Sequence, residues 1–301
     1  MERVSFRGLD TLRVFSLILI TWQHVASVHG LDAQTQWQRI TPGQTGVAIF
    51  CAISGLLAFA SLPSDLGLWI KKRLLKIFPA YWIVTFFAFL LVLIWPSKPV
   101  TAGLFISQML GLGFFSHGWA LVNIVSWFVS LILLCYALSV FGWYSRFPKV
   151  FWWVVSIVTV WLVVSRMEVD LSRHVLAFGL GALVALGGLR YLLWILSLGL
   201  IAFGVVADPQ FFYSGFGLLL ILISSYGLIK DAGLVRVCSA YGYEYFLIHG
   251  ICLVGAYRFF SNPVFGLAIA GTAAIFGSFI LKRITQFLES HLRGKFLSKS
   301  G

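Results

Sequence analysis

The stretch TLRVFSLILITWQHVASVH, residues 11–29, is the segment from which the fold is predicted. It is apolar and long enough to cross a bilayer as a helix, yet it carries Arg13 near its start and His24 deep inside. Eleven residues at about 100° each make close to three turns, so the two side chains share one face, roughly 16 Å apart along the axis. A cation near the membrane surface, aligned with an imidazole inside the membrane, indicates a polar passage along one wall.

The composition is that of a helical membrane protein. Of the 301 residues, 60% are hydrophobic and 11% are charged, against about 25% charged in soluble domains, and the mean hydropathy is +0.95. Apolar runs of roughly 17 residues or more, the length that spans a bilayer, recur along the chain. We therefore predict an all-α, polytopic transmembrane bundle that forms a single integral-membrane domain over residues 1–301.

The distribution of basic residues predicts the orientation. With the N-terminus in the cytoplasm, 17 Lys and Arg residues fall on the inner side and five on the outer side, as the positive-inside bias requires. We expect about ten spans and both termini in the cytoplasm. The expected spans are residues 11–29, 44–62, 78–96, 124–142, 150–165, 174–189, 191–207, 211–229, 241–260 and 264–281.

The net charge of +12 does not indicate nucleic acid as a partner. The basic residues cluster in alternate loops, where they lie beside anionic membrane lipid. The four cysteines fall in apolar segments without metal-ligand spacing, and His24 and His29 are five residues apart rather than four. We therefore expect no metal cofactor.

Two connections have unusual composition. The inner loop LWIKKRLLKIFPAYW, residues 68–82, is amphipathic and basic, and Pro79 suits the opening of the next helix. The region from Pro96 to Asn123 is apolar but short for a crossing. We expect it to form an interfacial or re-entrant segment on the outer side, covered by protein or lining a cavity.

Two expected spans carry small residues at helical spacing, which allows helices to approach closely. They are Ala177, Gly181 and Ala185 in one, and Gly266, Ala270, Ala274 and Ser278 in the other.

Ionisable residues within the spans are candidates for function, because a charge inside a bilayer is costly unless it is paired or hydrated. Asp10 and Arg13 are three residues apart and can pair on one helix face, although such a pair would also suit an interfacial anchor. His249 lies within YGYEYFLIHG, residues 241–250, and is about 140° around the helix from Glu244. Neither a phosphate-binding glycine loop nor a Ser–His–Asp hydrolase signature occurs, so acid–base chemistry at His24 is the simplest prediction.

Five segments, in order along most of the chain, resemble a known family. They are RGLDTLRVFSLILITWQH (7–24), GVAIFCAISGLLAF (46–59), KKRLLKIFPAYW (71–82), SWFVSLILLCY (126–136) and YGYEYFLIHG (241–250). Together they resemble the integral-membrane acyltransferase 3 family, whose members mostly transfer acyl groups to sugars of surface polysaccharides. The spacing from Arg13 to His24 is that of the family's opening motif.

The chain departs from the family pattern at two places. Where relatives usually have a second arginine in the basic segment, this chain has Lys76, which keeps the charge but not the bidentate fork. Where many relatives have one or two glutamates, it has Ile132 and Leu133. A carboxylate partner for the catalytic histidine therefore cannot be assigned from the resemblance.

The resemblance implies acyl-coenzyme A, with acetyl as the default acyl group, as the cytoplasmic donor. We assign its phosphates to Arg13, Lys72, Arg73 and Lys76, with Tyr81 in the same binding segment. His24 would act as general base on the acceptor hydroxyl, with Arg13 and Asp10 completing the catalytic site. Direct transfer and a transient acyl-imidazole both remain open.

The acceptor implied by the resemblance is a hydroxyl of a surface glycan or lipid-linked sugar at the cell membrane. We assign His249, Glu244, Trp127 and Ser130 to its binding. It would enter from the outer side, near the polar loop 30–44 and residues 117–119.

Two other classes of function remain as alternatives. A transporter or flippase for a small anion or a lipid-linked sugar would also have polar residues along a membrane passage. A scaffold within a glycan assembly complex would leave the buried His24 without a purpose. The sequence does not indicate the oligomeric state.

Overall fold

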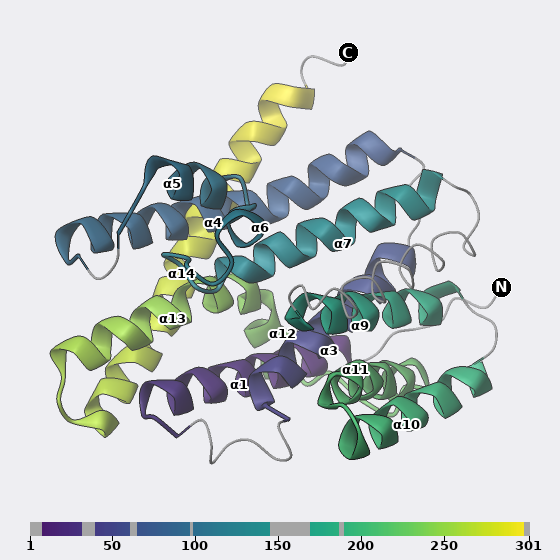
Figure 1. Ribbon diagram of the computed structural model, residues 1–301. Helices are drawn as coiled ribbons and strands as arrows, with labels where there is room; N and C mark the ends of the chain where they lie inside the picture. Colours follow the sequence, from purple (N-terminus) through teal and green to yellow (C-terminus); the bar gives the residue numbers. More distant parts are fainter. Residues whose placement is uncertain are drawn as a thin grey trace. The chain divides into compact units, whose positions relative to one another are not determined.

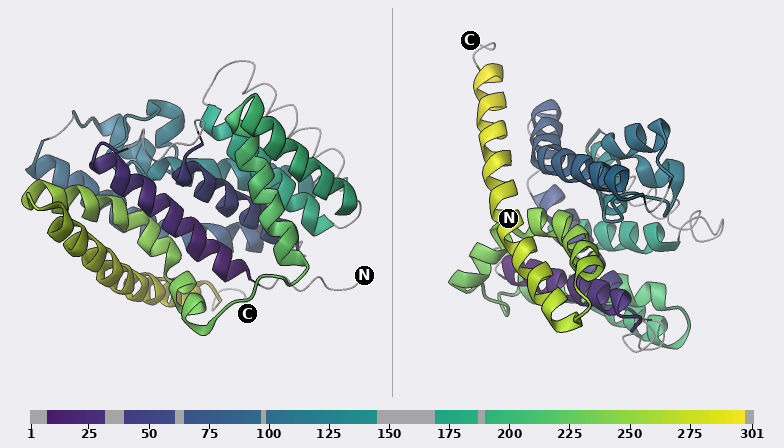
Figure 2. Two further views of the ribbon diagram at one scale, coloured as in Figure 1. Left: turned by 90° about the horizontal axis from the view of Figure 1, so that it is seen from below. Right: turned by 90° about the vertical axis from the view of Figure 1, so that its left-hand side faces the viewer.

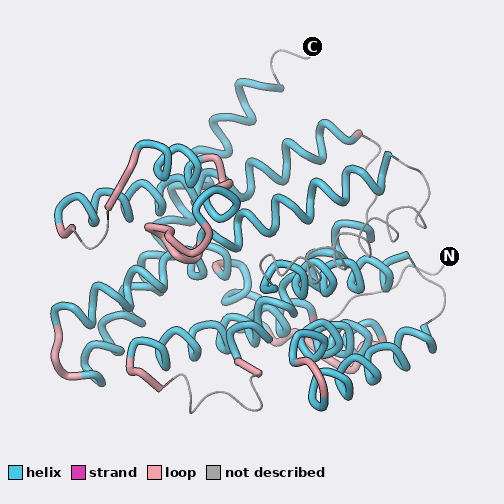
Figure 3. Tube along the Cα trace, viewed as in Figure 1, coloured by secondary structure: helices cyan, strands magenta, loops and turns pink. Residues whose placement is uncertain are grey.

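The computed structural model describes residues 8–31, 40–60, 65–96, 99–144, 169–186 and 190–297. Over these residues the chain is helical and forms no strand (Figure 3). The all-α prediction is confirmed for the described part of the chain.

The chain divides into two compact units, each built from two stretches of sequence. Unit 1 comprises Met1–Leu62 and Leu131–Ala240, and unit 2 comprises Pro63–Ser130 and Tyr241–Gly301. The helices of unit 1 are α1 (Leu9–Val28), α3 (Pro42–Ala60), most of α7 (Ser126–Tyr144), α9 (Val169–Leu186), α10 (Arg190–Val206), α11 (Pro209–Ser225) and α12 (Gly233–Ala240). The helices of unit 2 are α4 (Leu66–Ile94), α5 (Ala102–Met109), α6 (Gly113–His117), α13 (Gly242–Phe259) and α14 (Pro263–Leu297).

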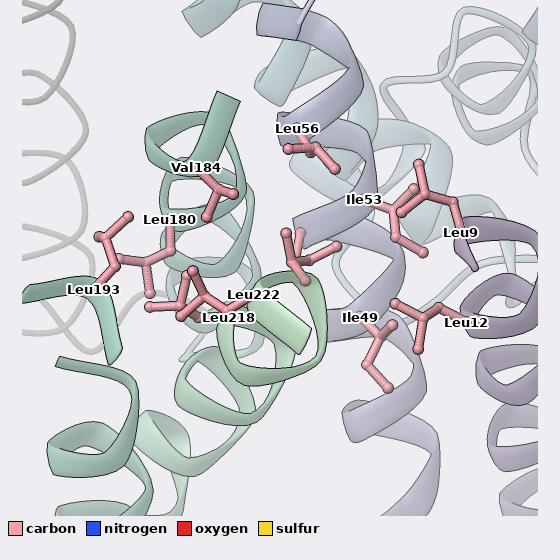
Figure 4. Packing of buried hydrophobic residues seen from close by; sticks show 12 residues of the cluster. Leu9, Leu12, Ile49, Ile53, Leu56, Leu180, Val184, Leu193, Leu218 and Leu222 are labelled. Carbon is pink, nitrogen blue, oxygen red and sulfur yellow. The ribbon is translucent and has the colours of Figure 1, made fainter. Parts of the chain in front are cut away.

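Helix α3 is the centre of unit 1, where it contacts α1, α9 and α11 (Figure 1). Its side chains Ile49 and Ile53 are buried against Leu12 of α1, and Leu218 and Leu222 of α11 belong to the same cluster (Figure 4). Lipid tails are as apolar as these side chains, so close van der Waals packing rather than burial from water holds such helices together.

Two glycines allow α3 and α9 to touch backbone to backbone. A Cβ on Gly55 would lie 1.9 Å from the carbonyl oxygen of Phe178, and one on Gly181 would lie 1.9 Å from that of Ala52. No side chain fits at either position without moving a helix. The small-residue stripe predicted around Gly181 is therefore confirmed as a helix contact.

In unit 2, α13 and α14 lie side by side as an antiparallel pair (Figure 2). The small residues Ala270, Ala274 and Ser278 of α14 are buried, as their spacing predicts.

The basic segment differs from the sequence prediction, because it is helix rather than loop. α4 begins at Leu66, where the Asp65 side chain accepts a hydrogen bond from the Leu68 N–H at 3.0 Å, and it continues through Pro79 to Ile94. An internal proline costs about 3 kcal/mol in a helix. Just after it, the Tyr81 hydroxyl and the Trp82 indole donate to backbone carbonyls of the following segment, and each such bond stabilises the fold by about 0.5–1.5 kcal/mol.

The apolar region that follows α4 forms two short helices, α5 and α6. The eight residues of α5 extend about 12 Å, too little to cross a bilayer. Gln108 fixes this segment, since its side chain donates to Ser126 Oγ at 2.9 Å and accepts from the Val122 N–H at 3.1 Å. The segment therefore forms no crossing, and its predicted place on the outer side stays a prediction.

The described helices lie where the spans were expected, but fewer of them than expected are long enough to cross a membrane. Every expected span within the described residues coincides with a helix, and the span 150–165 lies outside them. Among the described helices, α1, α3, α4 and α14 are long and apolar enough to cross a membrane, and α12 with α13, bent by 64°, would make a fifth. In α7, α9, α10 and α11 the structure describes apolar stretches of no more than 17 residues each. The chain is a multi-span helical protein, while ten spans are not confirmed.

Among the side chains that the structure describes in unit 2, the basic ones lie mainly at one end. The Tyr243 hydroxyl donates to the Ile77 carbonyl at 3.0 Å, so α13 begins beside the basic half of α4. At the other ends of the same two helices, the rings of Trp95 and Phe259 are 5.8 Å apart. The basic end holds Lys71, Lys72, Arg73, Lys76, Lys282 and Arg283, and the opposite end holds Arg258.

Candidate active site

One face of α1 carries the two residues from which the site was predicted. Arg13, Leu17, Ile20 and His24 follow one another at spacings of four, three and four residues, which places them on one helical face. Leu17 and Ile20 are buried, and Arg13 and His24 are half-buried. The most exposed large side chains of the helix, Phe15, Ile18 and Trp22, lie at other positions. The face that carries Arg13 and His24 is therefore less exposed than the side of the helix that carries Phe15, Ile18 and Trp22.

Asp10 is the partner of Arg13, as the spacing predicts. Arg13 Nη1 donates to Asp10 Oδ1 at 2.7 Å, and Ser239 Oγ of α12 donates to the same oxygen at 2.7 Å. A guanidinium has five N–H donors, so this pairing orients Arg13 and leaves it able to bind a phosphate. The contact joins the start of α1 to α12.

Asp231 holds the first turn of α1, a role that the sequence analysis missed. Its carboxylate accepts the backbone N–H groups of Gly8 and Thr11 at 3.0 and 2.9 Å. Partial burial alone would raise the pKa of Asp231, but these hydrogen bonds outweigh it and hold the pKa below its ordinary value. The carboxylate thus caps the helix that carries Arg13 and His24.

Gly8 takes the left-handed conformation, with φ of +82°, directly before α1. A Cβ there would lie 2.6 Å from the Ile229 side chain. In the sequence, this site is marked only by a glycine just before the start of a helix. Its neighbour Ile229 is more than 200 residues away, and no local pattern predicts a contact over that distance.

The basic face of α4 lies in unit 2. Lys72 and Lys76 are exposed and four residues apart, so they project from one side of the helix. The Arg73 guanidinium lies 5.2 Å from the centre of the Trp69 ring. Tyr81 is fully buried and its hydroxyl donates to the Gln108 carbonyl. Lys72 and Lys76 therefore form an accessible cationic surface, while Tyr81 anchors α5.

A second polar cluster in unit 1 was not assigned from the sequence. His174 of α9 is fully buried, and its Nε2 hydrogen bonds with Gln44 Oε1 of α3 at 2.7 Å. The Arg173 guanidinium lies 5.0 Å from the centre of the Tyr213 ring, and the Tyr213 hydroxyl accepts the Thr41 N–H at 3.0 Å. The starts of α3, α9 and α11 thus meet at one polar cluster.

Two of the residues assigned to the acceptor lie buried in α13. His249 Nδ1–H donates to the Phe246 carbonyl at 2.7 Å, and the ring stacks on Tyr245. Glu244 Oε1 accepts from Lys282 Nζ at 3.0 Å, and Oε2 is buried without a hydrogen-bond partner among the described residues. Glu244 is therefore a buried carboxylate held by one ion pair.

The other two lie at the start of α7 and are also buried. Trp127 packs among the rings of Phe114, Trp119 and Phe128. Ser130 Oγ donates to the Gly111 carbonyl at 2.6 Å, at a turn where Gly111 has a φ of +74°. Both residues hold the segment after α5 in place, and their assignment to the acceptor stays a prediction.

The predicted site residues are divided between the two units. Asp10, Arg13 and His24 belong to unit 1, and the remaining assigned residues belong to unit 2. Among the described residues, no three His, Cys, Asp or Glu side chains gather as metal ligands would.

A comparison with models of protein families identifies the family of this chain. A model of the acyltransferase 3 family, described as an acyltransferase domain, matches residues 6–283. The chain belongs to the acyltransferase 3 family. No curated protein and no solved structure matches it. The match takes in stretches of both units, from the start of α1 to the middle of α14. Together with the apolar helices, it makes this chain a multi-pass membrane acyltransferase of the acyltransferase 3 family.

Proposed function

We propose that this acyltransferase transfers an acyl group, acetyl by default, from cytoplasmic acyl-coenzyme A to a hydroxyl of a surface or lipid-linked glycan. The observation that carries the proposal is the alignment of Arg13 and His24 on one partly buried face of α1, with Arg13 held by Asp10. In a family of acyltransferases, an imidazole in that position is the natural candidate for the proton transfer.

Donor binding follows from charge. Coenzyme A carries several phosphate charges, and Lys72 and Lys76 present two exposed ammonium groups on one side of α4. Arg73 and the Asp10-paired Arg13 add guanidinium donors that match phosphate oxygens. These residues belong to the inner side in the proposed topology of ten spans with both termini in the cytoplasm.

His24 takes the proton in the proposed reaction. The acceptor hydroxyl gives its proton to the imidazole while its oxygen attacks the thioester carbonyl. The C–S bond then breaks, and the coenzyme A thiolate leaves and takes up the proton. In the variant with an acyl-imidazole, an imidazole nitrogen of His24 attacks the thioester carbonyl, the C–S bond breaks and the coenzyme A thiolate leaves. The sugar oxygen then attacks the acyl carbonyl, the C–N bond breaks, and the hydroxyl proton passes to the imidazole. An imidazole titrates near neutral pH, which suits either role.

A membrane assay with labelled acetyl-coenzyme A tests the proposal. We expect label on glycan in wild-type membranes and a loss of about 10²–10⁴-fold in His24→Ala, the usual contribution of a general acid–base group. His291→Ala is the matched control, because His291 is exposed near the end of α14. Full transfer by His24→Ala at equal protein level would exclude its role. Movement of a sugar or anion across the membrane without acylation would favour the transporter alternative.

A further inference from the structure

Unit 2 contains a cavity of about 310 Å³ that the proposed reaction does not use. It lies between the last turns of α4 and α13 and residues 122–124, at the end of the unit opposite the basic side chains. Its walls are apolar and are formed by side chains such as Leu91, Trp95, Val254 and Phe259. These four side chains are also exposed, so the cavity opens to the surface of apolar helices.

Asn123 and Arg258 lie in this apolar lining, and none of the described residues that line it is acidic. Asn123 is only 2% exposed, and its amide nitrogen has no hydrogen-bond partner among the described residues. A buried donor without a partner is costly, and a ligand oxygen that accepts from it would remove that cost. Arg258 adds a cation at the same wall, so the polar part of the ligand is an anion rich in acceptor oxygens.

The size of the cavity restricts the apolar part of the ligand. A volume of 310 Å³ is at the lower end of the roughly 300–1,000 Å³ that ligand pockets have. It therefore suits a segment of one hydrocarbon chain rather than the two chains of a phospholipid or an oligosaccharide. A single chain with a phosphate at its head meets both requirements.

We propose that this cavity binds the lipid end of a lipid-linked acceptor. The chain lies along the apolar wall, and the phosphate oxygens accept hydrogen bonds from Arg258 and Asn123. The proposal rests on the proposed function, because it names the form in which the glycan is presented. It would place the sugar at the end of unit 2 that the charge distribution assigns to the outer side.

Binding of a polyprenyl monophosphate to the purified protein, measured by native mass spectrometry, tests the proposal without any acyl transfer. A Cβ at Gly255, which lines the cavity, would meet nothing within 4 Å, so Gly255→Leu fills the cavity without a backbone clash. Gly271→Leu is the matched control, because Gly271 has the same free space and lies outside the cavity lining. We expect Gly255→Leu to lose binding and Gly271→Leu to keep it.

A second pair of variants tests the charge. Arg258→Gln should weaken binding about tenfold or more, whereas Arg283→Gln, which removes a cation from the opposite end of unit 2, should not. The proposal would be overturned if the wild type bound no polyprenyl monophosphate, or if phosphatidylglycerol displaced it equally well. Equal loss of binding in both variants of either pair would also overturn it. Retained binding in a protein whose membranes acylate no glycan would instead reject the proposed function and leave the lipid site standing.

Discussion

Arg13 is oriented by Asp10, whose carboxylate oxygen Oδ1 is also bound by Ser239. Asp10 Oδ1 accepts both Arg13 and Ser239, so the guanidinium is fixed relative to α12 as well as to its own helix. Lysine at position 13 would keep the charge, but a flexible ammonium cannot hold a planar fork between a carboxylate and a phosphate. The arginine in the opening motif therefore has a geometric reason as well as an electrostatic one.

Asp231 gives a prediction at the same scale. Asp231→Asn should lower the free energy of unfolding by about 1 kcal/mol, because the amide is a weaker acceptor for the N–H groups of Gly8 and Thr11. Since the pKa of Asp231 is lowered in the folded protein, its stabilisation is fully present above the ordinary value of 3.8. It is lost as the pH falls through the folded value.

Thermal unfolding in detergent, followed from neutral to acidic pH, measures this effect. The wild type should lose more stability than Asp231→Asn over the acidic part of the range, and the two curves should approach each other at the lowest pH. Parallel curves at all pH values would show that this carboxylate does not cap α1.

At the scale of the helices, the contact between α3 and α9 depends on two glycines. Gly55→Ala should destabilise the protein by about 1–3 kcal/mol or more, since the added methyl would overlap the Phe178 carbonyl. Gly199→Ala in α10 is the matched control, because nothing lies within 4 Å of its Cβ position. That change should be neutral or stabilising by roughly 0.5–1 kcal/mol. Unfolding in detergent compares the two, and equal midpoints would contradict the contact.

The same contact shows what the sequence can predict and what it cannot. The stripe of small residues around Gly181 predicts a close helix contact, because small side chains at helical spacing have that consequence in any membrane protein. It does not identify the partner, since Gly55 and Ala52 are more than 120 residues away. The start of α4 was missed for a different reason. Pro79 is a plausible first-turn residue, and the bonds of Tyr81 and Trp82 to the next segment, which accompany the continued helix, join residues 27 apart in the sequence.

In the candidate site, too, contacts within one helix can be predicted from the sequence and contacts between helices cannot. The Asp10–Arg13 pair and its shared face with His24 follow from spacing on one helix, and the structure confirms the pair. The cluster around His174 joins α3, α9 and α11, and isolated polar residues at three helix starts do not indicate that they meet. Contacts within an element are therefore predictable here, whereas contacts between elements are not.

At the scale of the molecule, the orientation in the membrane can be tested at two positions of unit 2 and one of unit 1. Leu68 lies at its basic end and Ser261 just after Arg258, and both are exposed. In a Cys238→Ser background, an impermeant thiol reagent added to intact cells should label Ser261→Cys, whereas Leu68→Cys should react only after lysis. The physical reason is that the basic end remains in the cytoplasm by the positive-inside bias. In the wild type, the exposed Cys238 of unit 1 should also react only after lysis. The reverse pattern would invert the proposed orientation and place the basic face of α4 beyond the reach of cytoplasmic acyl-coenzyme A.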